Sequence, residues 1–153
     1  MTKHIPVLLN SVMRELGDIR GYRILDATFG AGGYTRAFLD AGASVVAFDR
    51  DPHVVADANE IADEFGDRFR FIAAPFSKMS ELDEKFDAIV FDLGISSMQI
   101  DVPERGFSFR GDAPLDMRMD RSSPFSAYDI VNGHNYEELK KYLENFLEMK
   151  KNS

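Results

Sequence analysis

The chain has 153 residues, of which 44% are hydrophobic and 29% charged, a composition that is typical of a single globular domain and excludes a disordered chain. No apolar run approaches the ~20 residues of a membrane span, and the first residues lack the layout of a signal peptide, so no membrane partner is expected. The sequence contains no cysteine, which excludes disulfides, thiolate metal ligands and a cysteine nucleophile and is compatible with a reducing cytoplasmic setting.

The net charge of −8 argues at first sight against a nucleic-acid partner. The acidity is local, however. Residues 41–100 contain five basic and twelve acidic side chains, whereas residues 101–121 contain four arginines and five acidic side chains. The charge of the whole chain is therefore a poor guide to its partner.

Hydrophobic patterning predicts alternating helices and strands. An amphipathic helix is expected over residues 7–16, strands over 23–28, 45–49, 68–73 and 87–93, and helices over 34–42, 52–65 and 76–85. Pro52 suits the first turn of its helix. This order favours an α/β fold with a parallel sheet flanked by helices on both faces. Residues 94–135 have no sustained period, and an amphipathic helix follows over residues 136–150.

A glycine-rich turn follows the first predicted strand. Gly30, Gly32 and Gly33 allow left-handed backbone conformations and a close approach of a ligand. Asp49 ends the second strand, where a carboxylate can accept hydrogen bonds from the hydroxyls of a ribose. The pattern predicts a nucleoside-binding edge, although a turn without a ligand remains an alternative. Thr35 breaks the Gly-x-Gly-x-x-Gly pattern of dinucleotide sites, which disfavours NAD and suits a cofactor without pyrophosphate, such as S-adenosylmethionine.

The fourth predicted strand delivers Asp92 at its carboxyl end. In a doubly wound sheet the first and fourth strands flank the crevice, so Asp92 is expected to face the glycine turn. It can accept a hydrogen bond there from a cofactor or from the exocyclic amine of a base. The alternative is that Asp92 caps the turn of residues 94–97. Gln99 can reach the same crevice, although a single glutamine in a loop is usually solvated.

The segment that follows mixes aromatic and basic side chains. Aromatic rings stack on bases and guanidinium groups pair with phosphates, so this mixture suits single-stranded nucleic acid. The alternative places the phenylalanines in the core and pairs the arginines with aspartates. The side chains concerned are Phe107, Phe109, Arg105, Arg110 and Arg118, with Asp112, Asp116 and Asp120 as the alternative partners.

Two other kinds of site find no support in the sequence. His4, His53 and His134 are scattered and form no metal-ligand spacing, so no metal site is predicted. Ser96 and Ser97 lack the nucleophile-elbow pattern of hydrolases.

Several motifs, in this order and spacing, resemble the bacterial MraW/RsmH family over residues 4–130. They are HIPVLL, DATFGAGGYT, FDRDP, APFS, DLGISSMQID, ERGFSFR and PLDMRMD. The resemblance implies a Rossmann-like class I methyltransferase that uses S-adenosylmethionine. It also implies a cytoplasmic enzyme whose partner is 16S ribosomal RNA in the small ribosomal subunit, methylated at the exocyclic N4 of a cytidine.

The resemblance assigns roles residue by residue. It makes Gly32, Gly33 and Tyr34 the contacts of the methionine end of the cofactor and Asp49 the acceptor for the ribose. Tyr34 stands where histidine is common in the family. It places Phe76 beside the adenine, and Asp92 and Gln99 at the rest of the crevice. Asp92 is also the expected catalytic residue, as an acceptor for the amine of the cytidine.

Family members are longer than this chain, with a helical domain inserted after the fourth strand and further strands after it. The resemblance therefore divides the chain into a cofactor-binding core (1–100), a signature loop facing the substrate (101–130) and a helix that begins the inserted domain (131–153). The sheet is expected to be incomplete on its C-terminal side, with the first or fourth strand as an open edge. Impaired catalysis, a homodimer, a completing partner chain and a non-catalytic cofactor-binding module or relic all remain open.

Overall fold

The structure is a computed structural model that describes residues 6–146 of the chain. The chain divides into two compact units, Met1–Ser96 and Ser97–Ser153. Among the described residues, no helix is long and apolar enough to cross a membrane.

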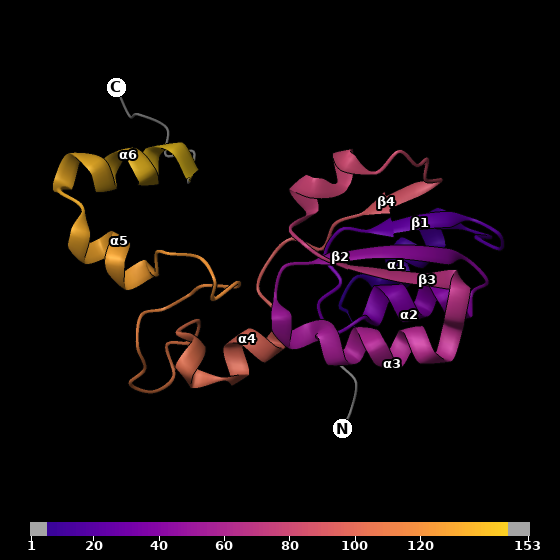
Figure 1. Cartoon of the computed structure of the whole chain (residues 1–153), viewed down its shortest axis with the longest axis horizontal. Coiled ribbons are helices and arrows are strands. Elements are labelled where there is room, and N and C mark those ends of the chain that lie inside the picture. The colour runs from indigo at the N-terminus through magenta and orange to yellow at the C-terminus, as the bar shows by residue number, and fades with distance from the viewer. Residues whose placement is uncertain (1–5, 147–153) are drawn as a thin grey trace. The chain divides into compact units, whose positions relative to one another are not determined.

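The first unit is built around a four-stranded parallel sheet in the order β3-β2-β1-β4 (Figure 1). The strands are β1 (Arg23–Asp26), β2 (Ser44–Asp49), β3 (Phe69–Ala73) and β4 (Ala88–Val90). The helices are α1 (Leu9–Leu16), α2 (Gly33–Asp40) and α3 (Val55–Phe65), with the short 3-10 helices η1 (Pro52–Val54), η2 (Gly66–Arg68) and η3 (Phe76–Glu81). The predicted parallel sheet flanked by helices, with the first and fourth strands adjacent, is confirmed.

The two faces of the sheet are covered by different segments. Helices α2 and α3 lie on one face, and the η3 segment lies on the other (Figure 1). Met79 of η3 packs against a buried cluster that includes Leu25 and Phe48, and so do Leu82 and Phe86, which follow η3 in the chain. Because both faces are covered, the middle residues of β1 and β2 are all apolar and buried, as in parallel strands generally. The buried apolar side chains of the described residues all fall between Ile19 and Phe69.

Three local expectations are modified. The predicted helix over 76–85 is only the 3-10 helix η3, which ends before Leu82, where the backbone becomes extended. The predicted strand over 87–93 is only Ala88–Val90, because it pairs with just three residues of β1. The predicted helix over 52–65 begins as η1, where Asp51 accepts a hydrogen bond from the His53 amide.

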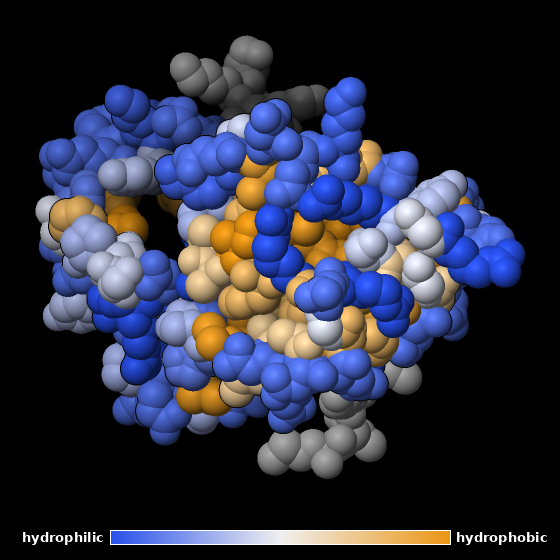
Figure 2. All heavy atoms as spheres, turned by 45° about the vertical axis from the view of Figure 1, so that its right-hand side comes forward, coloured by the Kyte–Doolittle hydropathy of each residue, from blue (hydrophilic) through white to orange (hydrophobic). Residues whose placement is uncertain are grey.

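Of the two strands that the sequence offered as an edge, β4 is one, opposite the other edge strand β3, whereas β1 lies inside the sheet. Alternate apolar side chains along β4 and its continuation are exposed, namely Ile89, Phe91, Leu93 and Ile95. Figure 2 shows a cluster of apolar side chains on one face of the molecule, with several hydrophilic side chains lying over it.

The second unit contains short helices joined by irregular chain. They are α4 (Ser97–Asp101), η4 (Pro103–Arg105), α5 (Ala127–Gly133) and α6 (Tyr136–Phe146). The helix predicted over 136–150 corresponds to α6, and residues 147–150 lie outside the described residues. Helices α4 and α5 were not predicted. A capping box of Ser126 and Asp129 begins α5, and this Ser-x-x-Asp pattern is a sequence signal for a helix start.

Candidate functional site

The turn between β1 and α2 depends on glycine. Gly30 and Gly32 have φ angles of 54° and 75°, in the left-handed region, and Gly33 begins α2. A Cβ atom at Gly32 would lie 2.7 Å from Ile61 Cδ1 and 3.0 Å from Phe29 Cζ. Gly32 is therefore required both for the backbone conformation and for the space around it.

The side chain of Asp49 joins this turn to the end of β2. Asp49 Oδ2 accepts a hydrogen bond from the Gly30 amide at 2.8 Å, and Oδ1 accepts one from the Asp51 amide at 2.9 Å. Each carboxylate oxygen has a second lone pair, so both can still accept hydrogen bonds from a ligand. The glycine turn and the carboxylate singled out in the sequence thus lie together at the carboxyl ends of β1 and β2.

Asp26, which sequence reasoning did not single out, is the buried centre of the same turn. Its Oδ1 accepts a hydrogen bond from the Thr28 amide at 3.1 Å, and its Oδ2 accepts one from the Thr35 hydroxyl at 2.7 Å. Burial raises the pKa of Asp26 to about 6; the two hydrogen bonds oppose this shift, and the charges of Asp49 and Asp92 add to it. A carboxylate inside an apolar strand is the signal that could have identified Asp26, because burying one is costly.

Asp92 lies next to this turn. Its backbone amide donates a hydrogen bond to the Thr28 hydroxyl at 2.7 Å, and its side chain is exposed. The pKa of the Tyr34 phenol is raised, first by burial and then by the negative charges of Asp92 and Asp26. Tyr34, at the start of α2, therefore lies close enough to Asp92, just after β4, for the charge of Asp92 to affect its pKa.

The structure gives different positions to the two remaining predicted contacts. Phe76 is 41% exposed, and its ring meets that of Phe91 edge to face, with centroids 5.5 Å apart. It therefore lies beside the residue that precedes Asp92. Gln99 is a buried residue of α4 in the second unit, and its expected place at the crevice stays a prediction.

A second pair extends the network beyond Asp49. Asp51 is buried, and its Oδ1 lies 2.9 Å from Nδ1 of His53, whose backbone amide also donates to it at 3.0 Å. The exposed histidine is therefore oriented by a carboxylate. No cluster of three potential metal ligands exists among residues 6–146.

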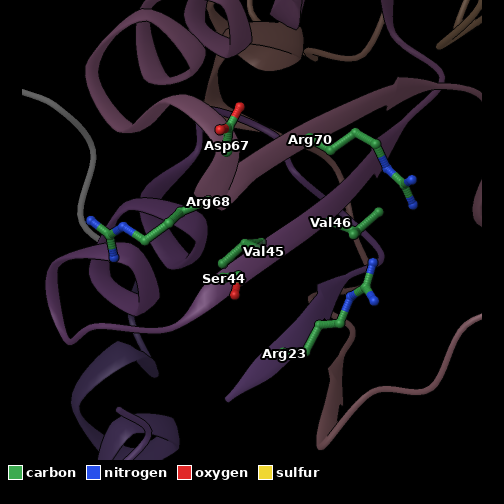
Figure 3. Close-up of a pocket in the computed structure, with 7 residues that line it drawn as sticks. All are labelled: Arg23, Ser44, Val45, Val46, Asp67, Arg68 and Arg70. Atoms are coloured by element: carbon green, nitrogen blue, oxygen red, sulfur yellow. The ribbon is translucent and has the colours of Figure 1, made fainter. Parts of the chain in front are cut away.

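A hollow of about 300 Å³ lies at the opposite, amino-terminal edge of the sheet (Figure 3). Arg23 and Arg70 point to one side of it, where both form ion pairs with Glu84, and Arg68 points to the other side. The Arg68 guanidinium donates to the carbonyl oxygens of Leu39 and Ala43 at 2.8 and 3.2 Å. These arginines hold neighbouring segments together, and ligands of such sheets bind at the other edge.

The parallel sheet, with a glycine turn after β1 and a carboxylate after β2, defines a Rossmann-like α/β protein. Residues 1–152 match the sequence profile of the MraW methylase family, and the chain belongs to this family. The family expected from the sequence motifs is thereby confirmed.

Two curated relatives carry the name ribosomal RNA small subunit methyltransferase H. The protein of Bartonella tribocorum is 53% identical over 131 residues, which cover 85% of this chain and 39% of the relative. The protein of Mesorhizobium japonicum is 53% identical over 130 residues, covering 85% and 38%. The chain thus spans about two-fifths of the length of these relatives.

Among solved structures, the C-terminal domain of precorrin-6Y C5,15-methyltransferase from Rhodobacter capsulatus is similar, with a TM-score of 0.52 and 17% identity. The match covers 60% of this chain and 50% of that one. This similarity supports the fold alone.

Proposed function

We propose that the chain binds S-adenosylmethionine at the carboxyl edge of its sheet and serves methyl transfer to N4 of a cytidine in 16S ribosomal RNA of the small ribosomal subunit, in the cytoplasm. The observation that carries the proposal is the 2.8 Å hydrogen bond between the Gly30 amide and Asp49, in a chain of a methylase family. This hydrogen bond holds the glycine turn beside a carboxylate that can still accept hydrogen bonds from a ligand. A nucleoside that carries a small charged group requires this arrangement.

The proposed contacts follow the shape and charge of this edge. Gly32, Gly33 and Tyr34 contact the methionine end, Asp49 accepts from the ribose hydroxyls, and Phe76 borders the adenine, with Gln99 as a further contact. The negative charges of Asp49 and Asp92 add to the rise in the pKa of Asp26, so this edge is acidic. Such an acidic environment favours a sulfonium cation over the neutral thioether that remains after transfer.

When bound, S-adenosylmethionine supplies a methyl group that its sulfonium already activates. The task of the chain is to hold the cytidine amine in line with that methyl group, at about 3 Å, after the base has left its stack. The lone pair of the amine is delocalised into the ring. We assign Asp92 as the catalytic residue, because a carboxylate that accepts an N–H of the amine localises that pair and can take the proton released as the N–C bond forms.

Two measurements test the proposal. Calorimetric titration of the chain with S-adenosylmethionine is expected to give saturable binding that Asp49→Asn weakens about tenfold or more. Transfer of labelled methyl groups to unmethylated small ribosomal subunits is expected to fall at least about 100-fold in Asp92→Asn, the lower range for loss of a general base. Asp92→Asn with unchanged affinity and unchanged turnover would refute the catalytic assignment.

A non-catalytic cofactor-binding module is the second candidate, because the hydrogen bond between the Gly30 amide and Asp49 supports cofactor binding and does not by itself require methyl transfer. Binding of S-adenosylmethionine without transfer, both for the chain alone and with the remaining part of a relative added in trans, would support it. Binding of NADH in place of S-adenosylmethionine would overturn both candidates.

A further inference from the structure

The aromatic and basic side chains of residues 105–118 belong to two structurally different sets. Arg105 is only 3% exposed, and its Nη2 donates hydrogen bonds to the carbonyl oxygens of Arg118 and Met119 at 3.2 and 3.1 Å. Its guanidinium carbon lies 5.7 Å from the centre of the Phe107 ring. Arg105 thus serves the internal structure of the second unit, with the half-buried ring of Phe107 beside its guanidinium.

The two ends of the loop over residues 107–113 are held together. Gly106 has a φ of 72°, and a Cβ atom there would lie 2.4 Å from the Pro114 carbonyl oxygen and 2.7 Å from the Asp116 amide nitrogen. The Arg105 carbonyl accepts a hydrogen bond from the Met117 amide at 3.0 Å. The chain entering the loop therefore packs directly on the chain leaving it, and only glycine fits at position 106.

The tip of this loop carries the other set. Phe109 is fully exposed at 107% of its reference area, and the neighbouring Arg110 is exposed too. The Arg110 amide donates to the Ser108 hydroxyl at 3.1 Å, which closes a local turn, and the Arg110 guanidinium has no hydrogen bond to any described residue. An aromatic ring held in water on an anchored loop loses little freedom on binding, because the loop is already ordered.

We propose that Phe109 and Arg110 form a docking element for unpaired RNA, in which the ring stacks on a base and the guanidinium pairs with a phosphate. The inference rests on the proposed function, in which RNA is the substrate. It adds to that function the residues that hold the RNA. Stacking on an aromatic face tolerates any base, and an arginine beside it adds a salt-dependent phosphate contact.

The absence of tryptophan from the sequence allows a direct test. Phe109→Trp introduces a single indole at the tip, and a single-stranded RNA oligonucleotide is expected to quench its fluorescence saturably. The matched control is Phe125→Trp, at a 63% exposed position of the same unit outside the loop, where no saturable quenching is expected. Arg110→Ala in the Phe109→Trp background is expected to weaken binding and to reduce the salt slope by about one.

Affinity measurements on tryptophan-free variants complete the test. Phe109→Ala is expected to weaken RNA binding at least about fivefold, whereas Phe109→Tyr, which keeps the ring, retains it. Equal affinities of the wild type and Phe109→Ala, or equal quenching at positions 109 and 125, would overturn the proposal. These readouts need no methyl transfer, so a failure of the proposed enzymatic function is seen separately, as RNA binding without labelled product.

Discussion

The hydroxyl of Thr28 accepts a hydrogen bond from the backbone amide of Asp92 at 2.7 Å, and the amide of Thr28 donates to buried Asp26 at 3.1 Å. Thr28 therefore connects the end of β4 to the glycine turn after β1. Asp26 extends the connection to α2 through the Thr35 hydroxyl. The Thr28 hydroxyl thus adds a side-chain contact to the backbone hydrogen bond from the Ala27 amide to the Val90 carbonyl, and both position Asp92 beside the glycine turn.

Replacing Thr28 by valine keeps the shape of the side chain but removes this acceptor. We expect Thr28→Val to lower the affinity for S-adenosylmethionine about two- to tenfold, which corresponds to the net contribution of one hydrogen bond. Calorimetric titration measures the change. Thr28→Ser is the matched control, because it retains the hydroxyl and is expected to bind as the wild type does. Equal affinities of all three proteins would show that water replaces the lost acceptor without cost.

Asp26 makes the stability of the fold depend on pH. Its pKa is raised from 3.8 to about 6 in the folded chain, so the folded state holds this proton more tightly than the unfolded state does. The free energy of unfolding therefore decreases as pH rises from about 4 to 6. Asp26→Asn imitates the protonated form, and its stability advantage over the wild type is expected to grow through this window to on the order of 3 kcal/mol.

Urea unfolding of both proteins between pH 4 and 7.5 measures this difference. A constant difference across the range would contradict the prediction. Thr35→Val removes the hydrogen bond that lowers the pKa of Asp26. In this variant the pH range over which the free energy of unfolding falls is therefore expected to reach to higher pH.

The cofactor edge could be predicted from the sequence because its residues follow strands. Asp49 ends β2 and Gly30 lies in the turn that follows β1, and adjacent parallel strands bring their carboxyl ends to one edge. The parallel sheet followed from the same alternation of strands and helices, and the doubly wound arrangement placed the first and fourth strands side by side. Asp26 was missed because its position inside β1 carries no ligand-like spacing, and only its burial and partners reveal its role.

The segment after β4 could be predicted only in outline. The sequence left open whether its phenylalanines and arginines bind nucleic acid or pair internally, and the structure supports the internal role for Arg105 and Arg118. Composition cannot separate Arg105 from Arg110, because burial depends on which backbone carbonyls the fold brings into reach. The helix expected over 76–85 was wrong in type for a similar reason, since packing of Met79 on the sheet favours the tighter helix.

Gly32 is expected to be the most sensitive glycine of the turn. Gly32→Ala adds both left-handed backbone strain and a contact of 2.7 Å with Ile61 Cδ1. Gly66→Ala is the matched control, because Gly66 also has a positive φ, of 56°, but has no atom within 4 Å of the added Cβ. We expect Gly32→Ala to lower the free energy of unfolding by about 1–3 kcal/mol more than the control does, as overpacking usually does. Equal losses in urea unfolding would mean that the Ile61 side chain moves away freely.

The ion pair of Asp116 and Arg118 lies in the segment that leaves the loop presenting Phe109. The guanidinium donates two hydrogen bonds, at 2.7 and 2.9 Å, and holds the pKa of Asp116 at about 2. A depressed carboxylate pKa means that its contribution to stability is present above pH 3.8 and is lost as pH falls towards 2.

Asp116→Asn is therefore expected to destabilise the second unit by about 1 kcal/mol at neutral pH, a value reduced by solvent screening, and to have little effect near pH 2. Hydrogen exchange of the Met117 amide, which donates to the Arg105 carbonyl, measures this local change. Asp112→Asn serves as the control, because Asp112 is exposed and has no hydrogen bond to a described residue. If both variants exchange equally fast at neutral pH, the ion pair does not hold the loop. Because the loop positions Phe109, Asp116→Asn should also weaken RNA binding, whereas Asp112→Asn should not.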